Sequence, residues 1–420
     1  MTSLEPGAGL VRSHLPAHGS SPDGRFAPVA PLGSIGFMAV VVASFGGPLA
    51  LAALYVPTTL AGVSGSTGLI AVAGAVAFTV PLAVWLGYSR KIHGPAGLTG
   101  FVQAAAGRRV ALSQAALWTA SYLLYLIYTT VTIVYDILPK VIPGVRPYRP
   151  MLEVALPLVL AGVLLAGRRG TVTVLGIVAV GQLALVAALA VVTLRQSGPA
   201  PAYLTPTSAP VAPAATAAAQ TSLLYVCGSL PLFLGGEVLR PTRTVRKGTV
   251  AGFLVAAAGV VAVAAPLAAN PGFAYSEIPG VSMARAFAGE QFAVAVGLGI
   301  AASVAALMLV EVLALTRLLH AVTGFSIASM TRVLAVVLAV AGPVSLVDPE
   351  GFYNALLKPS LVALWLSLLI VFVVYPRFAA RYAPRQEGRG ARMLRALALT
   401  AGASAFAIYG IYVTLQQAAT

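Results

Sequence analysis

Long apolar runs recur along almost the whole of this sequence, from Ile35 to Val413, and they restrict the folds open to it. A helix of about 20 apolar residues crosses a hydrocarbon core of roughly 30 Å. Only helices and closed barrels satisfy their backbone hydrogen bonds in lipid, and the alternating pattern of barrel strands is absent here. Charged residues make up 9% of the 420, whereas a soluble domain carries about a quarter. The sequence therefore predicts an all-α polytopic membrane protein.

Eleven transmembrane helices are predicted. They cover residues 33–58, 65–88, 110–138, 151–167, 171–194, 219–239, 248–268, 291–317, 329–347, 357–375 and 394–414. With a cytoplasmic N-terminus, 20 of the 26 lysines and arginines fall on the cytoplasmic side. This excess follows the positive-inside rule, so we expect a multi-pass protein of the cell (inner, cytoplasmic) membrane. It also accounts for the formal charge of +15 without a nucleic-acid partner. Asp136 and Glu153 flank the basic outer loop, and we expect both side chains to lie on a solvated surface.

Few residues are suited to hold a metal or a cofactor. Cys227 is the only cysteine, which excludes an internal disulfide and a cysteine-based metal site. The four histidines are scattered, without metal-ligand spacing. We therefore expect no metal site and no cofactor. Residues 1–32 lack an apolar core and predict a disordered cytoplasmic tail in place of a signal peptide.

Two of the predicted helices are interrupted in the middle. The first contains Ser44–Pro48 (SFGGP) and the sixth contains Gly228–Pro231 (GSLP). Proline removes a backbone donor and glycine lowers the cost of unwinding. Backbone groups freed at membrane depth must line a cavity, because lipid cannot satisfy them. For either interruption alone, the alternative is an ordinary kink or a packing contact, since glycine and proline are common in membrane helices.

The spacing of the interruptions predicts an internal repeat. Pro48 and Pro231 are 183 residues apart and are separated by five helices. A repeat of five helices reverses orientation in the membrane, and matching interruptions in inverted halves mark the central site of secondary transporters. The predicted parts are a tail (1–32), the first repeat (33–195), an external loop (196–218), the inverted second repeat (219–375), and a cytoplasmic loop with helix eleven (376–420).

Two motifs carry a family resemblance. The sixth helix ends in Gly236–Arg246 (GEVLRPTRTVR), and the basic loop Arg90–Gly97 (RKIHGPAG) precedes a third helix with Trp118, Tyr122 and Tyr125. In these features the sequence resembles the amino acid–polyamine–organocation (APC) superfamily, whose sixth helix ends in G-E-x-x-N-P-x-R-x-x-P-R. The resemblance implies a five-plus-five inverted-repeat bundle of the LeuT type that transports an amino acid or a related amine.

The resemblance covers about residues 33 to 375 and departs from the family in two helices. Where the family usually has Gly-Phe-Glu in helix six, this chain has Cys227–Ser229, so an acidic group is missing. Helix five has no lysine of the kind that occupies a cation site in some proton-coupled relatives, and Gln182 is its only strongly polar side chain. The coupling ion is therefore left open between a proton and sodium.

Charged side chains inside a membrane are costly and are functional candidates by default. Glu311 is the deepest of them. We expect it to act as a proton carrier or an ion ligand; the alternative is that it forms a structural ion pair with cytoplasmic arginines. Glu237 ends helix six beside Arg240 and Arg243, which favours a structural or gating salt bridge. Ser303, midway along helix eight, has a hydroxyl that would bind a cation or solute, or bond back to its own helix.

Helical spacing places aromatic residues of helix three, including Tyr122 and Tyr125, near one face. A tyrosine can contact the apolar part of an amino acid with its ring and the polar part with its hydroxyl. The alternative is that these residues pack in the core or anchor the helix at the membrane interface. We predict a solute site between helices one, three, six and eight. Its residues are Ser44, Phe45, Gly46, Gly47, Tyr122, Tyr125, Cys227, Gly228 and Ser229, with Glu237, Ser303 and Glu311 as coupling or gating residues.

The predicted function is secondary active transport of an amino acid or amine by alternating access, driven by a proton or sodium gradient. One alternative is a transporter for another solute or of the major-facilitator type. The latter predicts an Asp-Arg-Gly motif, and Arg90–Gly97 contains no acid. A membrane-embedded enzyme predicts clustered His, Asp or Glu at one interface, which the sequence lacks, and a channel needs no matched interruptions. We therefore expect a permease and no enzymatic activity.

Overall fold

The computed structural model describes residues 31–63, 65–198, 201–206, 210–382 and 389–416. Within them, eleven helical segments are long and apolar enough to cross a membrane, and we call them spans one to eleven. Each predicted range overlaps one of these spans, which confirms the number and order of the predicted helices. Residues 1–30 of the predicted tail lie outside the described part.

Most spans of the first half are built from several consecutive segments. Span one comprises α1 (Ser34–Ser44), α2 (Pro48–Ala50), η1 (Leu51–Tyr55) and α3 (Val56–Leu60); span two is α4 (Thr67–Ser89), and α5 (Gly97–Ala106) follows it; span three comprises α6 (Arg108–Val131), η2 (Thr132–Ile137) and α7 (Leu138–Val141); span four comprises η3 (Pro143–Tyr148) and α8 (Arg149–Leu165); span five is α9 (Arg168–Ser197), and α10 (Pro201–Leu204) follows it.

The second half repeats this organisation. Span six comprises α11 (Val211–Leu223) and η4 (Val226–Glu237); span seven comprises α12 (Pro241–Gly259), η5 (Val260–Ala264) and α13 (Ala265–Ala268), and the short α14 (Pro271–Ala274) and α15 (Pro279–Ala288) follow; span eight is α16 (Glu290–Thr323); span nine comprises α17 (Ile327–Ala341) and η6 (Gly342–Leu346); span ten comprises α18 (Pro349–Val373) and α19 (Tyr375–Tyr382); span eleven lies in α20 (Arg389–Gln416).

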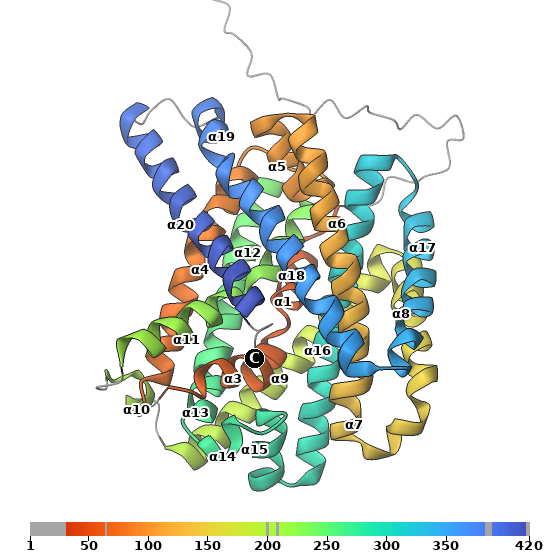
Figure 1. Ribbon diagram of the computed structural model, residues 1–420, viewed down its shortest axis with the longest axis vertical. Helices are drawn as coiled ribbons and strands as arrows, with labels where there is room; N and C mark the ends of the chain where they lie inside the picture. The colour runs from red at the N-terminus through yellow and green to blue at the C-terminus, as the bar shows by residue number, and fades with distance from the viewer. Residues whose placement is uncertain (1–30, 64, 199–200, 207–209, 383–388, 417–420) are drawn as a thin grey trace, which may run out of the picture.

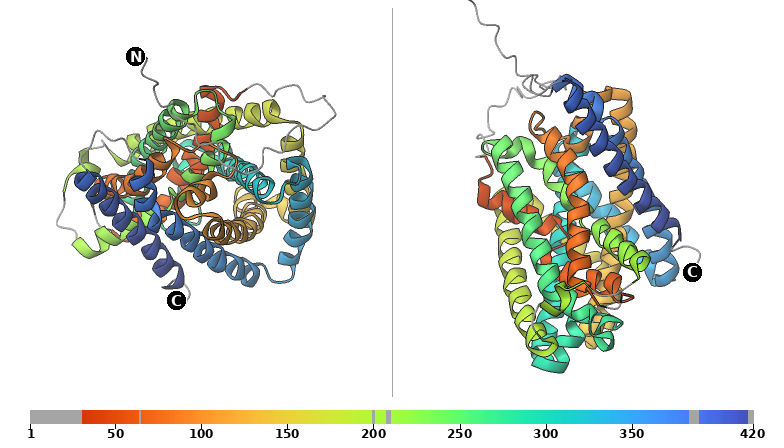
Figure 2. Two further views of the ribbon diagram at one scale, coloured as in Figure 1. Left: turned by 90° about the horizontal axis from the view of Figure 1, so that it is seen from above. Right: turned by 90° about the vertical axis from the view of Figure 1, so that its left-hand side faces the viewer.

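The bundle has a buried centre and a lipid-facing rim. Spans one, six, eight and three are the four most buried, and they are the spans that the sequence assigns to the site. At the rim, α8 packs against α17, and α20 packs against α4 and α18 (Figure 1). Span eleven lies on the outside of the bundle (Figure 2). The two interrupted helices therefore occupy the interior, where freed backbone groups cannot reach lipid.

The two ends of the bundle differ in charge. The end that holds α5 and α19 lies at the top of Figure 1 and is called the basic end, because α19 contains Arg377 and Arg381 and the loop before α5 contains Arg90 and Lys91. The opposite end holds α14 and α15, the short helices between spans seven and eight. Helix α15 packs against η1 and α9, so it contacts the second half of span one.

Candidate substrate and coupling site

Span one loses its helical conformation at three residues. Helix α1 stops at Ser44, Phe45 leaves the helix with ψ at 23°, and Gly46 and Gly47 follow with φ of 80° and 69° before α2 begins. Only glycine adopts such positive φ values without strain. A Cβ atom on Gly47 would also overlap the side chain of Ser303. The predicted interruption is therefore confirmed, and both glycines are required by their geometry.

Span six is interrupted differently from the prediction. Its α-helix ends at Leu223, and after a turn at Tyr225 the chain continues as the 3-10 helix η4 through Glu237. Pro231 lies inside this 3-10 segment, so the change of conformation precedes the predicted Gly228–Pro231 by a few residues. Pro231 cannot donate a backbone hydrogen bond, and 3-10 runs longer than three or four residues are uncommon. The long 3-10 segment thus replaces the predicted unwinding.

The two interruptions contact each other. Gly228 faces the ring of Phe45 so closely that a Cβ atom at this position would overlap it. Tyr225, at the turn of span six, packs edge-on against Phe45 with ring centroids 6.3 Å apart. Ser44 and Ser229 are fully buried, and their hydroxyls bond back to the carbonyls of Val41 and Val226. The structure therefore brings the predicted residues of spans one and six together at the centre.

Span three supplies one wall of this centre. The Tyr122 ring is buried and packs on Trp118, with centroids 4.1 Å apart. Its hydroxyl lies next to Cys227 and Ser229 but makes no hydrogen bond of normal geometry. Tyr125 is half-buried, and its ring lies 6.5 Å from that of Tyr122. The aromatic face predicted on helix three thus faces span six.

Glu311 of span eight is fully buried, and neither carboxylate oxygen has a hydrogen-bond partner. The carboxyl group lies close enough to Tyr55, Tyr122 and Cys227 to interact with them electrostatically. The alternative of a structural ion pair is not realised, since no ion pair of Glu311 occurs in the described part of the chain. A lone carboxylate is very costly in an apolar interior unless it is protonated or meets a cation.

A second polar contact lies at the break of span one. The Ser303 hydroxyl donates to Oε1 of Gln182 at 2.6 Å, which joins spans eight and five, and Gly47 sits directly against both groups. The amide nitrogen of Gln182 is buried without a partner. Sequence reasoning noted Gln182 only as the one polar group of its helix. Its pairing with Ser303 spans 121 positions, and no local pattern reveals it.

At the basic end of the bundle, a salt bridge joins span eight to the end of span six. Arg317 donates to both oxygens of Glu237, at 2.6 Å and 3.1 Å, and Arg168 lies 3.9 Å from the same carboxylate. The predicted salt bridge of Glu237 is therefore present, but its predicted partners were wrong. Arg240 and Arg243 form no ion pair with it among the described residues, because span six ends there and Arg240 begins the next turn with φ of 52°.

Backbone pairing reinforces the same closure. The amide of Leu32 donates to the Glu237 carbonyl at 2.7 Å, and the Leu239 amide donates to Leu32 at 3.0 Å. The start of span one is thereby tied to the end of span six. These contacts, with the Glu237–Arg317 pair, are called the basic-end clasp.

The two motifs behind the family resemblance meet next to the clasp. Gly236 faces Gly94, and a Cβ atom on Gly97 would overlap the ring of Phe233. His93 lies 3.3 Å from the Thr242 hydroxyl, and partial burial lowers the pKa of this imidazole. The loop Arg90–Gly97 therefore forms a seam against the end of span six.

The opposite end has its own contacts, which the sequence did not indicate. Lys140 pairs with Asp136 on its own helix and lies 3.7 Å from Glu277, in the segment between α14 and α15. The hydroxyls of Tyr128 and Tyr353 bond to each other between spans three and ten. Contacts from three segments thus cover the centre on this side.

The solvated position predicted for Glu153 was wrong. This side chain is fully buried, accepts from the Ser345 hydroxyl at 2.9 Å and pairs with Arg149 at 3.2 Å. It therefore joins span four to span nine. Helix α8 packs against η6 and α17, and an apolar count along span four does not reveal these tertiary contacts.

The fold of the chain is similar to that of several solved transporters. A mutant of the Eremococcus coleocola manganese transporter matches with a TM-score of 0.66 at 12% identity, over 91% of this chain and 86% of that one. MhsT in complex with L-phenylalanine matches with 0.63 at 13% identity, over 90% and 98%. Mhp1, a nucleobase-cation-symport-1 family transporter, matches with 0.55 at 13%, over 92% and 94%. No family model and no curated protein sequence matches the chain.

Proposed function

We propose that the chain is a secondary active transporter of a small amine or amino acid, coupled to a proton or sodium gradient. Its LeuT-like fold of eleven spans, with interrupted helices one and six, supports this proposal because solved secondary transporters have a similar fold. The observation that carries this proposal is the unpartnered carboxylate of Glu311, buried among the four innermost spans. Burying an ionisable group inside a membrane costs free energy, so such a group is a functional candidate by default.

The proposed solute lies between Phe45, Tyr122 and the 3-10 segment at Gly228. The short helix beginning at Pro48 would present unpaired backbone N–H groups to the solute carboxylate. Tyrosine rings and the Tyr122 hydroxyl, which has no hydrogen bond of its own, would receive its amine and apolar part. The solute of MhsT in its solved complex is L-phenylalanine, which supports an amino-acid-like solute for a shared fold.

Glu311 is the proposed coupling group. In its apolar surroundings the carboxyl group is stable when it holds a proton or contacts a cation, and it is unstable when bare. Binding of one coupling cation would therefore lower the cost of closing the bundle around the solute. Release of that cation on the other side would raise this cost again and favour reopening.

Two closures would alternate in this cycle. The basic-end clasp is made in this structure, and α15 covers span one at the opposite end, with Lys140 near Glu277. Contacts are therefore made at both ends of the bundle in this structure. We propose that each closure opens in turn, with the basic end facing the cytoplasm.

A binding screen tests the proposed solute class. The purified protein would be heated with each member of a panel of amino acids and amines, since a ligand that binds the folded state raises the melting temperature. We expect at least one member to stabilise the wild type and to lose this effect in Gly228→Leu, where the new side chain displaces Phe45. Equal stabilisation of the Gly228→Leu variant would overturn the placement of the solute.

A further inference from the structure

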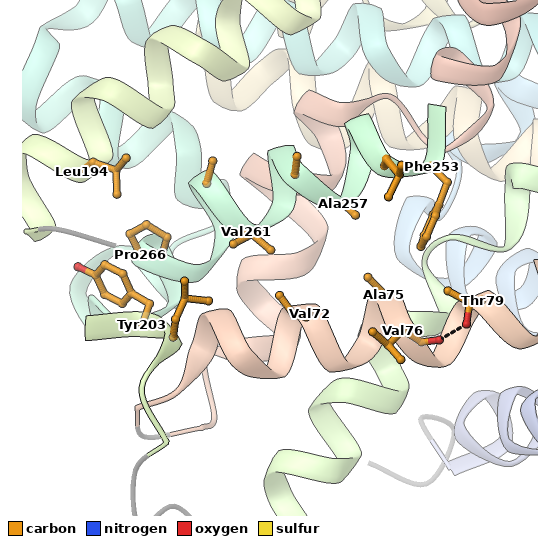
Figure 3. Close-up of a pocket in the computed structure, with 14 residues that line it drawn as sticks. Val72, Ala75, Val76, Thr79, Leu194, Tyr203, Phe253, Ala257, Val261 and Pro266 are labelled. Carbon is orange, nitrogen blue, oxygen red and sulfur yellow. Dashed lines mark hydrogen bonds between the residues drawn. The ribbon is translucent and has the colours of Figure 1, made fainter. Parts of the chain in front are cut away.

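A groove runs between α4 and span seven at the lipid-facing side of the bundle (Figure 3). Its volume is about 620 Å³, within the usual range of small-molecule pockets. The lining residues are Val72, Ala75, Val76, Thr79, Leu194, Tyr203, Leu204, Phe253, Leu254, Ala257, Ala258, Val261, Ala262 and Pro266. Of these, only Thr79 and Tyr203 are polar, and the Thr79 hydroxyl already donates to the Val76 carbonyl. The groove therefore suits an apolar occupant.

The shape and position of the groove indicate an acyl chain. On span seven the lining extends from Phe253 to Pro266, which corresponds to roughly 20 Å of helix. One leaflet of the hydrocarbon core is about 15 Å thick, half of the whole. Val76 and Leu254 on its rim are 60% and 59% exposed, so the groove is continuous with the surface that faces lipid. A single extended hydrocarbon tail matches this length and this access.

The inner wall of the groove contacts both interrupted helices. Phe253 is buried, and its ring lies 5.9 Å from Phe45 at the break of span one and 5.3 Å from Tyr225 at the turn of span six. It also packs on Phe78 of α4 at 5.4 Å. The Phe253 side chain thus links the lining of the groove to the centre of the bundle.

We propose that this groove binds one acyl chain of a membrane lipid, and that the bound chain holds the interruptions of spans one and six closed. With the groove filled, the Phe253 ring has no space behind it and must stay against Phe45. With the groove empty, the ring can turn outward, because close packing around it is lost. Phe45 and Gly228 are then free to separate.

Photo-crosslinking of the unmodified protein tests the occupant. Detergent-solubilised full-length chain would be equilibrated with phosphatidylcholine that carries a diazirine on one acyl chain, irradiated and digested. We expect saturable labelling of the peptides containing Val76 and Ala257, above that of other lipid-facing peptides. Even labelling of all lipid-facing spans would overturn the proposal, as would labelling of these peptides that does not saturate.

The rate of alkylation of Cys227, the only cysteine, measures whether the centre of the bundle opens when lipid is removed. Cys227 is buried beside Tyr122, so its rate of alkylation by a small maleimide measures opening of the interrupted region. We expect delipidated wild type to react at least about fivefold faster than protein resupplied with phosphatidylcholine, a ratio equivalent to ~1 kcal/mol. In Ala257→Phe, whose new ring fills the groove, the rate should stay low with or without lipid.

The matched control is Val336→Phe, which adds the same ring at a lipid-facing position of α17 that is 60% exposed. This variant should respond to lipid as the wild type does. A wild-type rate that does not depend on lipid would overturn the proposal. A lipid response retained in Ala257→Phe would also overturn it, because the groove would then not be the site.

Discussion

Loss of the Glu237–Arg317 pair should open the bundle at its basic end. The pair is bidentate, and the Arg317 side chain is only 7% exposed, whereas that of Glu237 is 27% exposed. Hydrogen bonds to charged groups contribute about 1.5–3 kcal/mol when sheltered, and exposed pairs contribute about 0–1. For this partly screened pair we take about 2 kcal/mol, which shifts a two-state equilibrium roughly 30-fold.

Alkylation of Cys227 measures that shift without any added probe site, because the chain has one cysteine. We expect Glu237→Gln to raise the rate by about 30-fold. Arg317→Gln should raise the alkylation rate less. In this variant Arg168 still lies near the Glu237 carboxylate, which is also partly exposed to solvent. The double variant should resemble Glu237→Gln, because both variants remove the same interaction.

Arg243→Gln is the matched control. This arginine is exposed, is one of the two partners that the sequence predicted for Glu237, and forms no ion pair with it in the described structure. Its alkylation rate should equal that of the wild type. An unchanged rate in Glu237→Gln, or an equal increase in Arg243→Gln, would refute the assignment of the clasp.

Three further outcomes follow from single sites. Glu311→Gln should leave the melting temperature unchanged or higher, because it removes an uncompensated buried carboxyl group, whereas Glu350→Gln on the exposed surface should change nothing. Gly47→Ala should destabilise by at least about 1–2 kcal/mol in denaturant unfolding, since φ is positive there, while Gly62→Ala, with open space around it, should cost far less. The lowered pKa of His93 means that the folded protein disfavours its protonated form; stability should therefore fall as pH decreases below 6.5, and His93→Gln should weaken this fall in a series of melting curves.

The fold follows from features that are local in the sequence. Hydropathy alone sets the eleven spans, and the glycines and proline at 46–48 predict the break of span one, because their backbone preferences act within a few residues. The break of span six was misplaced by a few residues. Its 3-10 segment packs on the Phe45 ring at Gly228, and this tertiary contact is not visible in the local sequence.

The hydrogen-bond and ion-pair partners of the buried polar groups lie far away in the sequence and are brought together by helix packing. Glu237 meets Arg317 across 80 positions, and Glu153 meets Ser345 across 192. A sequence shows which side chains are costly to bury but not which neighbour satisfies them. For this reason Glu311 was identified as a candidate, while its lack of any partner emerged only from the structure.

Gradient-driven uptake into proteoliposomes tests the central claim most directly. Radiolabelled amino acids and amines would be offered to vesicles with an imposed proton or sodium gradient. Transport by this account predicts that at least one solute accumulates only with a gradient, and that Glu311→Gln loses the stimulation but keeps its fold. Absence of gradient-stimulated uptake for every member, with folded wild-type protein, would contradict it, as would full stimulation in Glu311→Gln.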